Sequence, residues 1–496
     1  MGLPGLRMVN GDMRRIQNAL AAGGITLLGL VFWALSGSDG QPLGWSNLIA
    51  HTFVGALVVL MTIDLQRLDG RLQIGLSRPA ALFAIFYALY YLIPHLIVTL
   101  QGGWEENDDM VTAGLILLGY SAWMIGSRLG GNNPTLTQCA RFSVSRNGAL
   151  GLLAICVLGV VGVAYGFAWR ISEGIFFNQA RYFEQAATVV DSFRFVFLAQ
   201  IQLPIILLLG MLSAGRFLEV KAIAGTLLLT YGAGLSVLLI MSSQTRPAVS
   251  AALFTVLALK FGASDSVGMR RLLAVAAVGA FGIVVVQSLR TSAKDDFAGA
   301  ENQLIFALKN AFSKTSETIG DAESRRAAES AVLTRASGGV QFLSEIWREV
   351  EARGGPLYGK GIAQGLPSLI PRIAWPDKPA TVPPQIVAQE LLGFPITYDA
   401  SLGPVTQFYL EGGWPGVFGG FVLLGWFVAW LTRNALAKGQ IGWWLALSFT
   451  WGHISNLEME VGLGLATALR SAVAAYLLWL VAVGLVRLLP QKRSET

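Results

Sequence analysis

The sequence predicts an all-α integral membrane protein with about twelve transmembrane helices and one large periplasmic loop. Of its 496 residues, 54% are hydrophobic and only 13% are charged, whereas soluble proteins carry about 25% charged residues. Its apolar stretches have the length of ~20 residues that a helix needs to cross a bilayer. They lack the strict alternation over ~10 residues that marks a barrel strand. Since lipid cannot satisfy backbone polar groups, such stretches predict helices.

The apolar stretches divide the chain into three parts. We expect about nine spans in an N-terminal transmembrane bundle (1–290), then a large loop (291–404), and about three spans in a C-terminal bundle (405–496). The stretch near 405–431 has room for a short helix followed by a span. The expected spans lie near 19–37, 47–64, 80–100, 110–127, 148–168, 195–213, 222–241, 247–262, 272–289, 405–431, 440–456 and 467–486.

The distribution of lysine and arginine predicts the orientation of these spans. With the N-terminus inside, the first two outer loops (38–46 and 101–109) contain no basic residue, and the second is acidic from Trp104 to Asp109. The inner segments hold more than half of the 36 basic residues. Because cytoplasmic loops collect positive charge, we expect both termini in the cytoplasm. The long loop 291–404 is then outside, and its length exempts it from the charge rule.

The large loop contains two apolar patterns typical of amphipathic helices. The first runs from Asn302 to Phe312. In the second, Leu343, Ile346, Trp347 and Val350 follow the i, i+3, i+4, i+7 spacing of one helix face. We expect both helices to lie on the membrane surface or on the bundle.

A proline-rich segment follows these helices. Four prolines fall between residues 367 and 379, after the turn Tyr358-Gly359-Lys360-Gly361. Each proline fixes its own φ and favours extended backbone in the residue before it. The segment is therefore expected to be a stiff, non-helical ribbon that holds the charged residues Arg372, Asp377 and Lys378 in place.

The ribbon sequence Pro371-Arg372-Ile373-Ala374-Trp375-Pro376-Asp377-Lys378-Pro379 resembles the signature of Wzy-type oligosaccharide repeat-unit polymerases, the O-antigen polymerase family. The likeness continues at Ser401-Leu402-Gly403, at Glu411-Gly412-Gly413-Trp414-Pro415-Gly416 and at Ser242-Ser243-Gln244-Thr245-Arg246. The overall plan, with a large late periplasmic loop, is also similar.

This resemblance implies a glycosyltransferase of the GT-C class in the bacterial inner membrane. Such an enzyme joins oligosaccharide repeats carried on undecaprenyl pyrophosphate, at the periplasmic face, without a cofactor or a bound metal. Its partners are the lipid-linked oligosaccharide, membrane lipids, a chain-length regulator and a flippase, and no nucleic acid is involved. The product is an O-antigen, a capsule or an exopolysaccharide.

The reaction needs cations near the outer leaflet to hold the pyrophosphate. Arginine suits this role because it stays charged and binds phosphate in a bidentate manner. Arg246 stands out because it lies in a very short outer connection between two spans, where a charge near lipid is costly. The expected pyrophosphate-binding residues are Arg372, Arg246, Arg181, Lys378 and Arg290.

The acceptor hydroxyl must also lose its proton to a base. Asp377 within the ribbon and Glu411 at the start of the long span are the expected catalytic carboxylates. His453, near an outer helix end, is a further candidate. With only three histidines and two cysteines in the chain, a histidine-rich metal site or a disulfide framework is not expected.

Three alternative functions remain open. An O-antigen ligase would use the same donor, although ligases usually carry a histidine in the large outer loop and 291–404 has none. A metal-dependent GT-C transferase would need an acidic pair in an outer loop, which the segment 104–109 offers and the first loop, with Asp39 alone, does not. A transporter or flippase would place ionisable residues deep in its spans.

Overall fold

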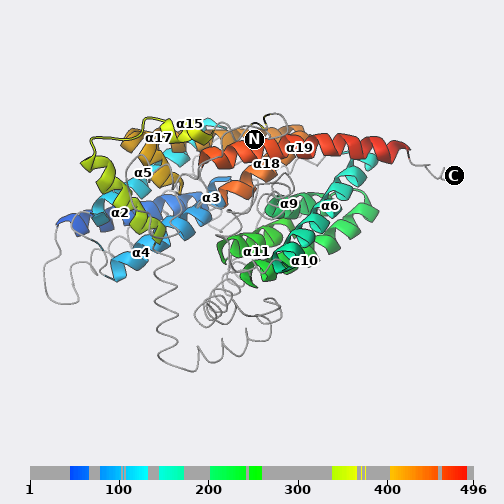
Figure 1. Ribbon diagram of the computed structural model, residues 1–496, viewed down its shortest axis with the longest axis horizontal. Helices are drawn as coiled ribbons and strands as arrows, with labels where there is room; N and C mark the ends of the chain where they lie inside the picture. Colours follow the sequence, from blue (N-terminus) through cyan, green and yellow to red (C-terminus); the bar gives the residue numbers. More distant parts are fainter. Residues whose placement is uncertain are drawn as a thin grey trace, which may run out of the picture.

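The computed structural model describes residues 45–65, 79–101, 104, 108–131, 144–172, 201–241, 245–259, 338–365, 370, 375, 403–455 and 461–488, and regular structure in these ranges is helical throughout (Figure 1). The first half contains α2 (Trp45–Leu65), α3 (Pro79–Tyr87), the π-helix η1 (Ala88–Leu92), α4 (Ile93–Leu100), α5 (Asp108–Leu129) and α6 (Arg146–Ser172). Then come α9 (Gln202–Ser213), α10 (Leu218–Met241), α11 (Thr245–Leu259), a helix over 338–352, α15 (Lys360–Gly365), α17 (Pro404–Lys438), α18 (Ile441–Ile454) and α19 (Val461–Leu488).

Six of these helical segments have the length and apolar composition needed to cross a membrane: Pro79–Leu100, Asp108–Leu129, Arg146–Ser172, Leu218–Ile240, Pro404–Lys438 and Ala468–Leu488. Three shorter apolar helices, Leu48–Thr62, Gln202–Ser213 and Pro247–Leu259, accompany them. This confirms the predicted class, an α-helical membrane protein. The expected spans near 19–37 and 272–289 and the helix expected over 302–312 lie outside the described residues.

The span 79–100 is continuous but changes its winding in the middle. The π-helix η1 precedes Pro94, which stands in the first turn of α4. Proline has no N–H to donate, and a π-turn is a common way for a helix to absorb such an interruption. In η1, the Tyr91 hydroxyl accepts a hydrogen bond of 3.2 Å from the backbone N–H of Val405. This bond joins the third expected span to the start of α17.

The helices α5 and α17 pack side by side and run parallel. Gly114 faces Trp414 near the beginning of both helices, and Gly130 faces Trp426 further along. A methyl group on Gly425 would lie only 2.5 Å from the carbonyl oxygen of Trp123. Small residues at such an interface let two helix backbones approach closely. Both spans were expected to run from the outside to the inside, and their relative direction agrees with that expectation.

The part of the core between α3, α5 and α17 is rich in aromatic side chains. The rings of Phe83 and Trp123 stack with centroids 3.7 Å apart. The Tyr87 hydroxyl donates a hydrogen bond of 2.7 Å to the carbonyl of Ile116. Phe421 of α17 meets Tyr87 edge-on at 5.9 Å. Because these buried rings are locked on three helices at once, they fix the positions of α5 and α17, which carry the polar residues described below.

The helix α17 is two helices joined at Gly413. Gly413 has φ 61° and ψ −150°, a combination that is essentially open to glycine alone. The sharp turn folds the first segment back, so that Phe408 lies against Gly416 and Gly420, and its ring meets Phe421 at 5.3 Å. This confirms the expectation of a short helix followed by a long one.

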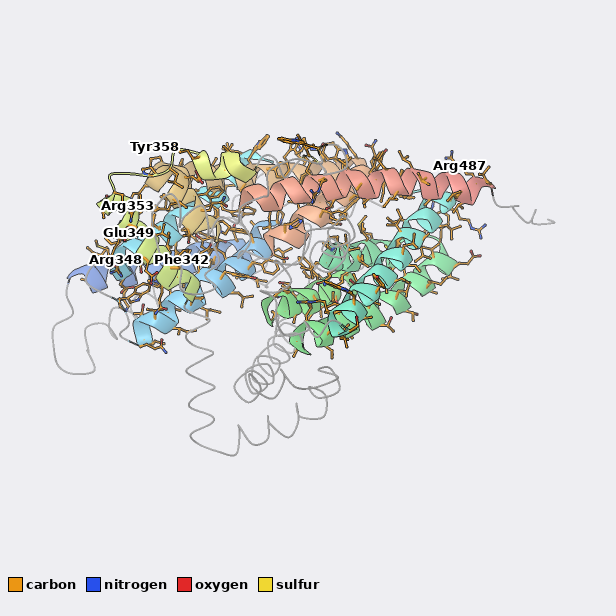
Figure 2. All side chains as sticks on the ribbon, in the orientation of Figure 1. Phe342, Arg348, Glu349, Arg353, Tyr358 and Arg487 are labelled. Carbon is orange, nitrogen blue, oxygen red and sulfur yellow. The ribbon has the colours of Figure 1, made fainter. Side chains whose placement is uncertain are left out.

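Two opposite ends of the molecule can be distinguished by the residues that lie there. Figure 2 shows Phe342, Arg348, Glu349, Arg353 and Tyr358 at one end and Arg487 at the opposite end. We call the first of these the loop end: it comprises the start of α5, the helix 338–352, α15 and the start of α17.

Candidate functional site

The helix 338–352 lies on the bundle at the loop end. Its apolar face is buried, with five side chains at most 2% exposed: Val340, Phe342, Leu343, Ile346 and Val350. The pattern predicted a helix with this face, and the structure shows that the bundle covers it. The large loop is therefore attached to the bundle through this helix.

Two polar contacts add to this attachment. Arg348 Nη2 lies 2.8 Å from Asp108 Oδ2, and the Asp108 side chain is only 3% exposed. The Tyr409 hydroxyl donates a hydrogen bond of 2.9 Å to Glu351 Oε1. Asp108 opens α5 and Tyr409 belongs to the short first segment of α17. The helix 338–352 is thus tied to both helices of the parallel pair.

We expect Arg348→Ala to lower the free energy of unfolding by about 1–3 kcal/mol, because the buried Asp108 carboxylate loses a charged partner. The matched control is Arg353→Ala, whose pair with Glu349 on the same helix (2.9 Å) is more exposed and should cost about 0.5 kcal/mol or less. Thermal unfolding of the detergent-purified variants measures both. Equal losses in the two variants would contradict a special role for the Arg348–Asp108 pair.

A second buried pair lies beside Asp108. His95 Nε2 is 3.0 Å from Asp109 Oδ1, and both side chains are at most 4% exposed. The Thr99 hydroxyl lies 3.4 Å from the same oxygen, and Trp104 Nε1 donates to Thr99 Oγ1 at 2.9 Å. Two of the four acidic residues of the segment 104–109 are therefore buried and paired with basic side chains, which close this end of α4 and α5.

Glu411 stands at the end of the short first segment of α17, directly before the turn at Gly413, and is 7% exposed. Its Oε2 accepts a hydrogen bond of 3.2 Å from the backbone N–H of Gly361, and the backbone N–H groups of Ile362 and Gly359 are its other partners. A side chain at position 361 would collide with the Glu411 carboxylate. The carboxylate therefore fixes the Gly359–Gly361 turn.

The segment from Gly354 to Gly361 is held along its length. The N–H of Gly355 donates to Val350 at 3.0 Å, and the N–H of Leu357 donates to the carbonyl of Leu410 at 2.8 Å. The second bond pairs it with α17 one residue before Glu411. In the sequence, α15 and then the proline-rich segment follow, and α17 thus fixes the backbone just before α15.

The ends of α11, α18 and α19 meet in a neighbouring polar cluster. The Ser250 hydroxyl lies 3.5 Å from the carbonyl oxygen of Ser455. His453 is 5% exposed, and a methyl group on Gly464 would touch its Cβ at 3.9 Å. Arg470 of α19 is near enough to interact electrostatically with His453. The short helix α15 contacts both α17 and α19.

Of the predicted site residues, the structure places Glu411 in full and Arg246 in part. Arg246 is the second residue of α11, which begins at Thr245, so it lies in the first turn of a helix rather than in the connection before it. Its side chain is outside the described part. Arg372, Asp377, Lys378, Arg181 and Arg290 also lie outside the described residues.

Sequence reasoning missed the partners of several polar groups. Arg348 pairs with Asp108, which lies 240 residues away in the sequence, and no local sequence pattern predicts this pair. Arg470 falls near the start of the expected span 467–486, whereas α19 begins six residues before that span, at Val461. Its charge inside an apolar stretch was a signal that could have singled it out.

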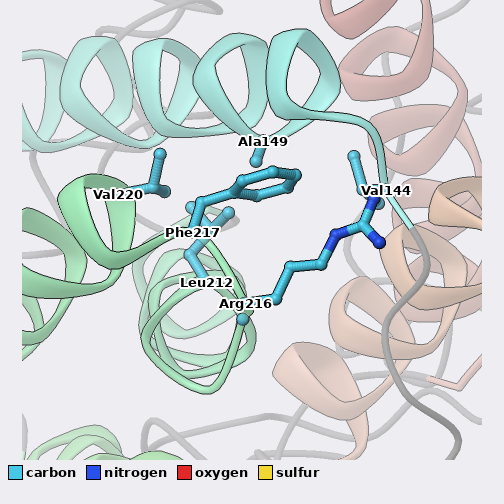
Figure 3. Close-up of a pocket in the computed structure, with 7 residues that line it drawn as sticks. Val144, Ala149, Leu212, Arg216, Phe217 and Val220 are labelled. Carbon is cyan, nitrogen blue, oxygen red and sulfur yellow. The ribbon is translucent and has the colours of Figure 1, made fainter. Parts of the chain in front are cut away.

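A small pocket lies away from these residues, where the start of α6 meets the end of α9 and the start of α10 (Figure 3). Val144, Ala149, Leu212 and Val220 line it, and the Arg216 guanidinium lies 4.9 Å from the centre of the Phe217 ring. Its lining is mostly apolar, and it shares no residue with the polar groups of the loop end.

Comparisons of the chain with protein-family models, with curated proteins and with solved structures find no match.

Proposed function

We propose that this protein polymerises oligosaccharide repeat units carried on undecaprenyl pyrophosphate, at the periplasmic face of a bacterial inner membrane. In this arrangement about twelve helices span the membrane, both termini are cytoplasmic and the loop end faces the periplasm. The parallel course of α5 and α17 supports this topology, since both expected spans run inward from that side.

The observation that carries the proposal is the contact between Glu411, which belongs to a segment that resembles the Wzy-type polymerases, and the turn Tyr358-Gly359-Lys360-Gly361. In the sequence this turn precedes the proline-rich segment, which carries the other main part of the resemblance. Gly361 and Glu411 lie 50 residues apart in sequence, and a hydrogen bond joins them. The bond thus ties Glu411 to the part of the chain that leads, through α15, toward residues 371–379, and this supports the proposal that both resembling segments belong to a single site.

The proposed reaction transfers the growing glycan from its pyrophosphate to a sugar hydroxyl of a second lipid-linked repeat. The anomeric carbon–oxygen bond to the pyrophosphate breaks, and a bond to the acceptor oxygen forms. The acceptor proton passes to a carboxylate, and undecaprenyl pyrophosphate leaves with the bonding electron pair. Arg372 and Arg246, with Arg181, Lys378 and Arg290, are proposed to stabilise the charge that develops on this leaving group.

The two predicted carboxylates are proposed to have different roles. Glu411 already accepts hydrogen bonds from backbone N–H groups, which suits a residue that holds the turn in place. Asp377 is then the proposed base. Asp108 and Asp109 are paired with Arg348 and His95. These contacts disfavour the metal-dependent transferase, because they engage two of the carboxylates that it would need.

Deletion of the gene, followed by electrophoresis of the surface glycans, tests the proposal. A polymerase mutant should lose the ladder of long chains and keep acceptors that carry a single repeat, and the wild-type gene should restore the ladder. Acceptors without any repeat would instead identify a ligase, and repeats trapped at the inner face would identify a flippase. An unchanged ladder would refute the proposal.

A further inference from the structure

The turn before the ribbon holds an aromatic residue in an unusual conformation. Tyr358 has φ 53° and is the one non-glycine residue with positive φ in the described part of the chain. The left-handed region costs free energy for a residue with a Cβ. Tyr358 is also 79% exposed, so burial of its ring does not offset that cost. Such an outlier points to a role outside the packing of the fold.

The surrounding structure imposes this conformation. Three glycines with positive φ, Gly354, Gly355 and Gly359, stand around Tyr358. The Leu357 N–H is bonded to Leu410, and Glu411 holds the N–H of Gly361. The backbone on both sides of Tyr358 is thus held by hydrogen bonds, and its ring lies at the edge of the loop end (Figure 2).

The neighbourhood of the ring is polar and leaves it accessible. Lys360 is exposed two residues further on. A methyl group on Gly355 would lie 3.1 Å from the Tyr358 hydroxyl, so the glycine leaves room beside the phenol. An aromatic ring offers an apolar face together with a polar tip, which matches a sugar ring with its C–H face and its hydroxyls. An ammonium group beside it suits the phosphate to which such a sugar is attached.

We infer that Tyr358 and Lys360 form a subsite for the sugar part of a lipid-linked oligosaccharide, with the Tyr358 ring stacked on a sugar ring. The inference rests on the proposed function and extends it, since it names a residue that contacts the glycan. Tyrosine in a membrane-interface belt is the competing explanation. A belt residue needs no particular backbone conformation and does not discriminate between sugar and lipid.

The test compares Tyr358→Gly with Tyr358→Phe in the full-length protein in nanodiscs. Glycine adopts positive φ without penalty, so the first variant should fold at least as well as wild type and lack only the ring. The second keeps the ring. Tyr165→Ala is the control, because Tyr165 is 55% exposed on α6, away from the turn. The probes are lipid-linked oligosaccharide extracted from the deletion strain and bare undecaprenyl pyrophosphate.

We expect Tyr358→Gly to bind the oligosaccharide probe about tenfold more weakly than wild type, and the bare lipid equally well. Tyr358→Phe and Tyr165→Ala should bind both probes as wild type does. Unchanged oligosaccharide binding by Tyr358→Gly, or an equal loss for both probes, would overturn the inference. If wild type itself binds the oligosaccharide no better than the bare lipid, the proposed function fails instead.

Discussion

Replacing Arg372 by alanine is expected to abolish long-chain polysaccharide while leaving the protein in the membrane. Arg372 lies among the four prolines of 367–379 in the sequence, and their fixed φ angles are expected to hold its guanidinium still. Loss of one preorganised donor to a developing negative charge typically slows a reaction by about 10²–10³-fold. Glycan electrophoresis gives the chain length, and immunoblotting of membrane fractions gives the protein level.

Two further variants sharpen this prediction. Arg372→Lys should also lose most of the activity, because lysine keeps the charge but not the bidentate geometry. Arg487→Ala, at the opposite end of the molecule (Figure 2), should leave the glycan ladder intact. Normal chain lengths in Arg372→Ala, at normal protein levels, would remove Arg372 from the proposed site.

Glu411→Ala is expected to lower polymer formation at least about tenfold, because the partly buried backbone N–H groups at Gly361 and Ile362 lose their acceptor. Leaving a buried donor unsatisfied costs about 1–3 kcal/mol, and 1.4 kcal/mol corresponds to a factor of ten. Gly361→Ala should resemble it, since the added methyl group collides with the same carboxylate. Rates of chain elongation by purified variants measure both effects.

The glutamine variant separates the two possible roles of Glu411. Glu411→Gln keeps one acceptor oxygen and the shape of the side chain, so a residue that holds the turn should retain a substantial part of its activity. A catalytic base cannot be replaced in this way, because an amide does not take up the proton. If Glu411→Gln is as inactive as Glu411→Ala, Glu411 would be the catalytic base. Gly419→Ala is the control, since it lies further along α17 and a methyl group there meets no neighbour within 4 Å.

The sequence alone predicted the helical membrane class, because the length and composition of an apolar stretch are local properties. A long apolar stretch in lipid must form a helix, since lipid cannot satisfy its backbone polar groups. It also predicted the amphipathic helix near 343–350 and the two-part nature of the stretch near 405–431. Both depend on short-range patterns, namely the i, i+3, i+4, i+7 spacing and the glycines after Glu411. The structure confirms these elements.

Only the tertiary structure decided which polar groups meet. The pairs Arg348–Asp108 and Glu411–Gly361, and the close passage of α5 along α17, join residues far apart in the chain. Such contacts depend on how whole helices pack, and the spacing of residues along the sequence does not predict that packing. The left-handed conformation of Tyr358 could not be predicted from the sequence either. Contacts with α17 and the helix 338–352 impose it, although tyrosine itself prefers negative φ.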